Sequence, residues 1–226
     1  MISEVDTLFH VWLHTKCRDR YKFQSSLFED FVNYLVTHKQ IYVIDKNFKD
    51  LFVRMRSYSL DVDRIIECVS PEVLASNFDD VFKHYENLRR SVVLLAKRIP
   101  KVIDENFDRV FDFYSRGNSD FSGLVKVVPN TIAKNFDKIF DYYVKHDFDF
   151  MNLCSYIPDT IDANFDKIFD YYVCKEYRFD RFATEIPNTI KRYRNKIREY
   201  YKRRCNTKSL FNKGKEVNYY EKGVVL

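Results

Sequence analysis

The chain has 226 residues, of which 46% are apolar, so it is long enough for one or two domains with a sizeable core. Its five cysteines are widely spaced and include no C-x-x-C pair, which excludes a disulfide framework and a zinc-finger spacing. The net charge is +5, but residues 193–226 contribute ten Lys/Arg against three Glu, which leaves −2 for residues 1–192.

Residues 1–41 are predicted to form an N-terminal cap of two amphipathic helices, within SEVDTLFHVWLHTK and SSLFEDFVNYLVTH. The N-terminus lacks the basic-then-apolar plan of a signal peptide, and the apolar run VVLLA at 92–96 is far shorter than the roughly 20 residues of a membrane span. We therefore expect an intracellular protein, cytoplasmic or nuclear, that is not secreted and has no membrane span. The scarcity of Ala, Gly and Pro favours an AT-rich source genome, such as that of a large DNA virus.

One possible metal site lies in this N-terminal segment. His10, His14 and Cys17 are spaced so that they share one helical face, and imidazole and thiolate are good zinc ligands. The set has only three ligands and lacks the glutamate of an H-E-x-x-H motif. The favoured interpretation is therefore a partly buried amphipathic face, and we expect no metal or other cofactor.

Residues 42–190 are predicted to be tandem helical repeats. The prolines recur at one fixed interval, of a length typical of stacked-repeat proteins, at Pro71, Pro100, Pro129, Pro158 and Pro187. Apolar residues occupy the third, seventh, tenth, eleventh and fourteenth positions after a proline, and a second set occupies positions 21, 24 and 28. Both spacings are helical. Each repeat is thus predicted to be a longer helix, a turn and a shorter helix that ends near the next proline.

The motif N-F-D recurs at the sixth position after four of the prolines, and a degenerate first copy at 42–55 has no proline. The Asn either caps a helix that follows a short proline-initiated turn or lies within one continuous helix, and the sequence leaves both possibilities open. A single repeat buries too little apolar surface to offset its own ordering, so the repeats have to stack. The predicted fold class is all-α: an α-solenoid of tandem 29-residue helix-pair repeats with N- and C-terminal caps.

The chain is predicted to end in a basic capping helix at 191–205, followed by a flexible tail at 206–226. Arg194 and Arg198 stand one repeat period after Phe165 and Phe169. Arginine at these core positions prevents a further repeat from packing, so this helix is predicted to close the array.

The segments LVKVVP (124–129) and LCSYIP (153–158) place a leucine ahead of an aliphatic-Pro step at the end of a helix pair. This pattern resembles the mitochondrial transcription termination factor repeat over about residues 60–204, and the resemblance implies a solenoid that binds nucleic acid along a basic groove. The chain is also similar to TAL-effector-like repeats, because near-identical helices alternate with turns that differ, at 116–120, 145–149 and 175–179. Surface turns vary freely in any fold, and this is the favoured explanation of the second similarity.

The sequence predicts a protein without catalytic residues or a small-molecule substrate. It contains no G-x-x-x-x-G-K-[ST], G-x-G-x-x-G or G-x-S-x-G motif. Paired aspartates such as Asp137 and Asp141 recur in successive repeats, whereas an active site is normally singular, so they are interpreted as a solvated helix face. The expected function is a non-enzymatic scaffold for an unidentified protein partner.

The alternative function is binding of DNA or RNA phosphates through the basic segment KRYRNKIREYYKRR at 191–204. A nuclear localisation signal, a solvated cap, and binding to an acidic protein or a membrane surface are further interpretations of this segment. The candidate residues for binding nucleic acid or an acidic partner are Lys191, Arg192, Arg194, Lys196, Arg198, Lys202, Arg203 and Arg204.

Overall fold

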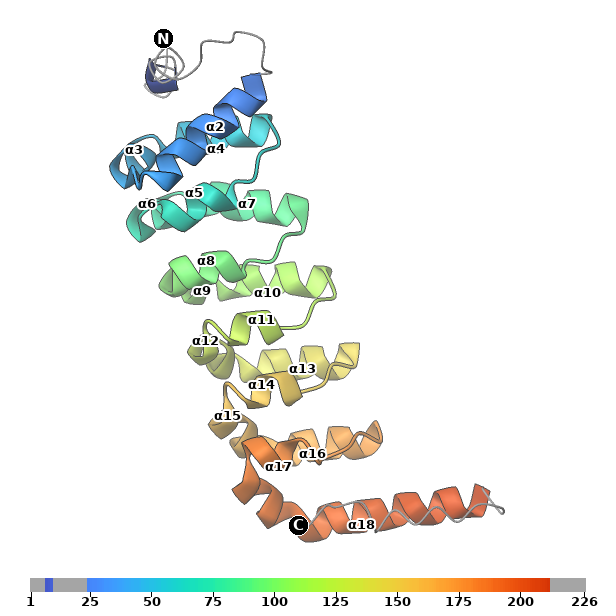
Figure 1. Cartoon of the computed structure of the whole chain (residues 1–226). Helices are drawn as coiled ribbons and strands as arrows, with labels where there is room; N and C mark the ends of the chain where they lie inside the picture. The colour runs from blue at the N-terminus through green and yellow to red at the C-terminus, as the bar shows by residue number, and fades with distance from the viewer. Residues whose placement is uncertain (1–6, 10–23, 212–226) are drawn as a thin grey trace. The chain divides into compact units, whose positions relative to one another are not determined.

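The computed structural model describes residues 7–9 and 24–211, and every regular element in these residues is a helix (Figure 1). This confirms the predicted all-α class for the described part of the chain. The chain divides into two compact units, an N-terminal body that ends at Gly117 and a C-terminal body that begins at Asn118. Much of the predicted N-terminal cap and most of the predicted tail lie outside the described residues.

The N-terminal body contains helix α2 (Gln24–Thr37) and then groups of short helices that recur along the chain. They are α3 (Ile41–Lys46), α4 (Phe48–Ser57), α5 (Asp63–Cys68), α6 (Pro71–Ser76), α7 (Phe78–Leu88), α8 (Val93–Arg98), α9 (Pro100–Glu105) and α10 (Phe107–Arg116).

The C-terminal body continues the same order and ends in one long helix. Its helices are α11 (Ser122–Val125), α12 (Pro129–Lys134), α13 (Phe136–His146), α14 (Met151–Cys154), α15 (Pro158–Ala163), α16 (Phe165–Cys174), α17 (Phe182–Glu185) and α18 (Pro187–Phe211).

Each repeat has three helices instead of the predicted two, because the first helix is interrupted at the Asn of N-F-D. Asn106 has φ −110° and ψ 24°, and its side-chain amide donates to the Val102 carbonyl at 2.9 Å. Asn164 does the same to the Thr160 carbonyl, also at 2.9 Å. The amide thus satisfies a carbonyl at the end of one helix, while the Asn carbonyl accepts the first hydrogen bond of the next helix. Of the two possibilities left open by the sequence, neither a side-chain N-cap nor a continuous helix is present.

The last repeat lacks this interruption. Tyr193 occupies the position that Asn164 has one repeat earlier, and α18 runs through this position without a break. The helix begins before residue 191 and ends at Phe211, so it is longer at both ends than the predicted capping helix at 191–205.

The spacing of the first two repeats differs from that of the others by one residue. Asn47 and Asn77 are one position further apart than the later N-F-D asparagines, and the extra residue is Ser70, which lies between α5 and Pro71. The Ser70 hydroxyl accepts the Val73 N–H at 3.5 Å, and the Ser70 N–H donates to the Asp45 carboxylate at 2.7 Å. Ser70 therefore caps α6 and ties it to α3.

A residue in the left-handed region recurs in the loop after each long helix. Ser59, Arg89, Asn118, Asp147 and Glu176 have φ between 48° and 64°. None of these residues is glycine, although this conformation disfavours residues with a Cβ atom. Each loop therefore adopts the left-handed conformation at the same repeat position without a glycine there.

Consecutive repeats within each body contact one another through their third helices and through tyrosine hydroxyls. Helices α5 and α8 lie together, as do α11 with α14 and α14 with α17. The Tyr143 hydroxyl accepts the Phe121 N–H at 3.0 Å, in the loop of the preceding repeat. In the equivalent places, the hydroxyl of Tyr172 donates to Asp149 and that of Tyr85 to Asp63.

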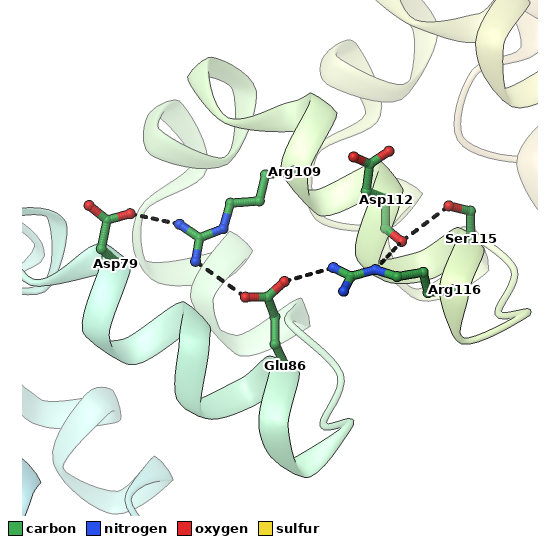
Figure 2. Close-up of polar contacts among 6 residues, drawn as sticks. All are labelled: Asp79, Glu86, Arg109, Asp112, Ser115 and Arg116. Carbon is green, nitrogen blue, oxygen red and sulfur yellow. Dashed lines mark hydrogen bonds and ion pairs between the residues drawn. The ribbon is translucent and has the colours of Figure 1, made fainter.

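Ion pairs at sequence separations near 30 also join consecutive repeats. In Figure 2, Arg109 of α10 lies between Asp79 (2.6 Å) and Glu86 (3.3 Å) of α7, and Arg116 also reaches Glu86, at 2.9 Å. In the C-terminal body, Lys167 pairs with Asp137 at 3.0 Å. The basic residue after N-F-D thus pairs with the aspartate of the preceding N-F-D.

Candidate partner-binding surface

Helix α18 carries all eight basic residues that the sequence singled out, and it has three distinct faces. Pro187 at its first turn has no N–H to leave unsatisfied, and Tyr193 allows the helix to continue where other repeats break. The helix of 25 residues is long enough to extend about 37 Å at 1.5 Å per residue.

The inner face of α18 holds its aromatic residues against α16 and α17. The Tyr193 ring lies 4.8 Å from the ring of Phe165 and 5.9 Å from that of Phe169. The Tyr201 hydroxyl accepts the Phe179 N–H and donates to the Asp180 carboxylate, both at 2.9 Å. The tyrosines interleaved with the basic residues are therefore packing residues, so they do not form an exposed platform for base stacking.

Burial raises the pKa of Tyr193 and of Tyr201 to about 12. For Tyr193 the neighbouring Asp166 adds to this effect, because the neutral phenol donates to the carboxylate. The same hydrogen bond, followed by the Lys196 ammonium, lowers the pKa of Asp166. Both hydroxyls therefore stay protonated, and able to donate, at physiological pH.

A second face of α18 pairs with acidic residues of the preceding repeat. Arg192 lies 2.5 Å from Asp162, and Lys196 lies 3.3 Å from Asp166. Arg204 donates to the Glu176 carbonyl at 2.7 Å. Arg203 has its carboxylate neighbour, Glu199, on α18 itself, at 3.9 Å. At least half of the predicted binding residues are thus already engaged in ion pairs or hydrogen bonds.

The third face is cationic and points away from the repeats that α18 packs against. Lys191, Arg198 and Lys202 are exposed and make no ion pair with the described residues, and Arg194 is exposed beside them. One repeat earlier, the positions of Arg194 and Arg198 are Phe165 and Phe169, which receive the Tyr193 ring. The surface that accepts the next repeat elsewhere is therefore basic in α18. We call Lys191, Arg194, Arg198 and Lys202 the outer face.

The ion pairs of Arg192 with Asp162 and of Lys196 with Asp166 were not predicted from the sequence, although the sequence spacing contains a signal for them. Each follows its aspartate at a sequence separation of 30, the separation that also joins Lys167 to Asp137. The outer face is thus smaller than the full set of basic residues in this segment.

The other candidate residues add no site to the described structure. His10, His14 and Cys17 lie outside the described residues, and residues 7–9 and 24–211 contain no group of three or more potential metal ligands. Within the same ranges, no helix combines the length and the apolar character that crossing a membrane requires.

Comparisons of the chain with family models, with curated proteins and with solved structures found no match.

Proposed function

We propose that the chain is a non-enzymatic α-solenoid scaffold that binds a partner protein along its tandem repeats. The observation that carries this proposal is the recurrence of one interface. Tyr143, Tyr172 and Tyr201 bond to the loop of the preceding repeat, and Tyr85 bonds to Asp63 at the start of α5, all at sequence separations of 21–23. A chain built by repeating one interface presents an extended periodic surface to a partner.

The titration behaviour of the repeats supports a structural role for their polar residues. The Arg90 side chain lowers the pKa of Asp61, and the Lys175 side chain lowers that of Asp147. Each of these carboxylates belongs to the repeat before that of its partner. The perturbed groups therefore serve contacts between repeats, which favours a scaffold over an enzyme.

The scaffold is tested by cross-linking mass spectrometry on a partner captured with the full chain. Expected cross-links join the partner to exposed positions of at least two successive repeats, such as Lys138 and Lys167. Cross-links confined to residues 191–226, or conversion of a substrate by the purified chain, would contradict the proposal.

A second candidate function is contact with nucleic-acid phosphates through the outer face of α18. The observation that favours it is the set of exposed cations Lys191, Arg198 and Lys202, which make no ion pair with the described residues. The resemblance to mitochondrial transcription termination factor repeats supports the same candidate. Because the tyrosines pack inward, this binding would contact the backbone and show little sequence preference.

Fluorescence anisotropy with labelled mixed-sequence DNA and RNA, between about 50 and 200 mM salt, tests the second candidate. Three phosphate contacts predict a log–log salt slope of about −3, which the variant Lys191→Glu/Arg198→Glu/Lys202→Glu should abolish. The matched control, Lys97→Glu/Lys145→Glu/Arg181→Glu, changes three exposed residues elsewhere and should leave the slope intact. Absence of binding at the lowest salt removes nucleic acid from consideration.

A further inference from the structure

We call the interface between the long helices of two consecutive repeats a step. The step between α7 and α10 is closed by side-chain contacts across it. The Arg109 guanidinium lies 4.5 Å from the centre of the Phe82 ring and 5.9 Å from that of Phe78. It also pairs with Asp79 and Glu86, on the same helix as the two rings (Figure 2). One arginine thus covers the aromatic pair and neutralises the acidic residues beside it.

The preceding step, between α4 and α7, has the opposite charges. Phe48 and Phe52 are the equivalents of Phe78 and Phe82, and their rings stack at 5.7 Å. Lys49 and Arg56 occupy the positions that Asp79 and Glu86 have in the next repeat. Asp80 occupies the position that Arg109 has one repeat later. The sequence shows the exchange directly, as NFKD at 47–50 and NFDD at 77–80 against NFDR at 106–109.

The exchanged residues do not close the step. Lys49 and Asp80 are exposed and make no ion pair with each other or with other described residues. A groove of about 250 Å³ lies at this point, lined by Phe48, Lys49, Phe52, Val53, Arg56, Asn77 and Asp80. The rings of Phe48 and Phe52 are themselves buried, and the hollow lies beside them. This step is also the one with the extra residue, Ser70.

The groove continues along the α3–α6 side. A second hollow of about 370 Å³ shares Phe48, Lys49 and Asn77 with the first and extends to Lys46, Glu72 and Ser76. Val53 at the rim of the first hollow has 55% of its surface exposed. The two hollows together have room for a short peptide segment, with Val53 as the exposed apolar residue at the rim.

We propose that this groove binds an acidic segment of a partner protein, with a carboxylate placed between Lys49 and Arg56 and an apolar side chain against Val53. The inference rests on the proposed scaffold function and gives that function a site. Charge complementarity carries it, because Lys49 and Arg56 occupy positions that are paired in the next interface and they lack a carboxylate partner among the described residues here. The second hollow also has two acidic lining residues, Glu72 and Asp45, the latter of which already accepts the Ser70 N–H, so the carboxylate is placed in the first hollow, where Lys49 and Arg56 face Asp80 alone.

A protein segment fits the groove better than a phosphate backbone. Val53 provides exposed apolar surface, and the Asp80 carboxylate in the lining would repel a continuous row of phosphates. The Arg56 guanidinium lies 5.5 Å from the centre of the Phe52 ring, which holds the cation at the floor of the groove.

The experiment measures anisotropy of a fluorescein-labelled synthetic helical peptide in which Glu and Leu lie one turn apart, with the full chain. Lys49→Glu/Arg56→Glu should weaken binding at least about tenfold, because both cations are reversed. The control Arg89→Glu/Lys97→Glu makes the same charge change at exposed positions of the same body and should bind as the wild type does. Circular dichroism of each variant confirms that the fold is retained.

A second variant restores the charges of the regular interface. Lys49→Asp/Arg56→Glu/Asp80→Arg places an arginine between two carboxylates, as Arg109 lies between Asp79 and Glu86, so it should raise the midpoint of urea unfolding and abolish peptide binding. This result separates loss of the site from loss of the fold.

Several outcomes would overturn the assignment. Peptide binding that is absent in the wild type, or equal in the wild type and Lys49→Glu/Arg56→Glu, removes the site. Duplex DNA binding that depends on Lys49 and Arg56 assigns the groove to phosphates instead. Self-association of the wild type that the same variant abolishes assigns it to a second copy. A captured partner that remains bound to every groove variant leaves the scaffold function standing and refutes this site alone.

Discussion

Buried tyrosine hydroxyls are the individual groups that join one repeat to the loop, or to the first turn of the third helix, of the repeat before it. Burial raises the pKa of Tyr85, Tyr143 and Tyr172 well above the usual value, and the carboxylates near Tyr85 and Tyr172 raise it further. A folded-state pKa above that of the unfolded chain stabilises the fold below about pH 10. That stabilisation is lost as the pH rises toward the folded-state values.

Alkaline titration tests this arrangement. The buried set should ionise only when the helices unfold, at a pH above the ordinary tyrosine value of about 10. Tyrosinate absorbance and circular dichroism, followed together, measure the two events. Ionisation of all tyrosines in one step near pH 10, with helicity retained, would refute the inter-repeat role of these hydroxyls.

The left-handed residues after the long helices give a second prediction. Arg89 has φ 52° and an exposed side chain, so Arg89→Gly should stabilise the chain by about 0.5–1 kcal/mol, because glycine removes the Cβ clash of this conformation. Urea unfolding measures the change. Arg89→Ala controls for loss of the side chain and should give no such gain. Equal stabilities of the Gly and Ala variants would contradict the assigned backbone geometry.

At the scale of the element, the helix break at Asn is a local hydrogen-bond device. The Asn164 amide bonds the Thr160 carbonyl at 2.9 Å in a partly buried place, so Asn164→Ala should destabilise the chain by about 1 kcal/mol. Asn195, which is exposed within α18, is the control, and Asn195→Ala should have little effect or a small stabilising one. Urea unfolding of the two variants decides, and equal midpoints would mean that the amide bond contributes nothing.

The arginine between α7 and α10 is the corresponding device between elements. Arg109→Ala removes two ion pairs and the contact with Phe82 and should cost about 1–2 kcal/mol. Arg116→Ala removes one pair from a side chain that is 70% exposed and should cost less than about 0.5 kcal/mol. The free energies of unfolding of the two variants are the measurement, and an equal loss would refute the role of Arg109 as the residue that closes this step.

The elements show what the sequence could and could not predict. The helical period and the inward phenylalanines followed from spacing alone, because apolar side chains must share one face. The break at Asn did not follow, because N-F-D suits both a capped turn and a continuous helix. At the break, the Asn amide donates to the carbonyl four residues earlier, and this contact is seen only in the structure.

The candidate site was predicted in outline. Its eight cations do lie on α18, but the engagement of Arg192 and Lys196 depends on the alignment of one repeat against the next. The groove between α4 and α7 was missed, although the exchange of charges at Lys49 and Asp80 was visible in the sequence. The consequence of this exchange became clear only from the structure, in which Arg109 covers the Phe82 ring at the interface between α7 and α10.

At the scale of the whole molecule, the proposed scaffold is an array of interchangeable repeats. In such an array each repeat contacts only its neighbours, so one more copy can be accommodated without redesign. A closed domain with one shared core could not accept the insertion of a whole repeat. The repeat at 129–157 is suitable, because its N-F-D-K motif recurs unchanged one repeat later, at 164–167.

The most direct measurement is therefore urea unfolding of a chain in which residues 129–157 are duplicated in tandem. The proposed array predicts a folded protein with proportionally more helix, an unchanged or higher unfolding midpoint and a larger m-value, since more surface is buried. As a control, a scrambled copy of the inserted segment should not give these gains. A duplicated chain that aggregates, loses helicity or unfolds at a lower midpoint would contradict the array.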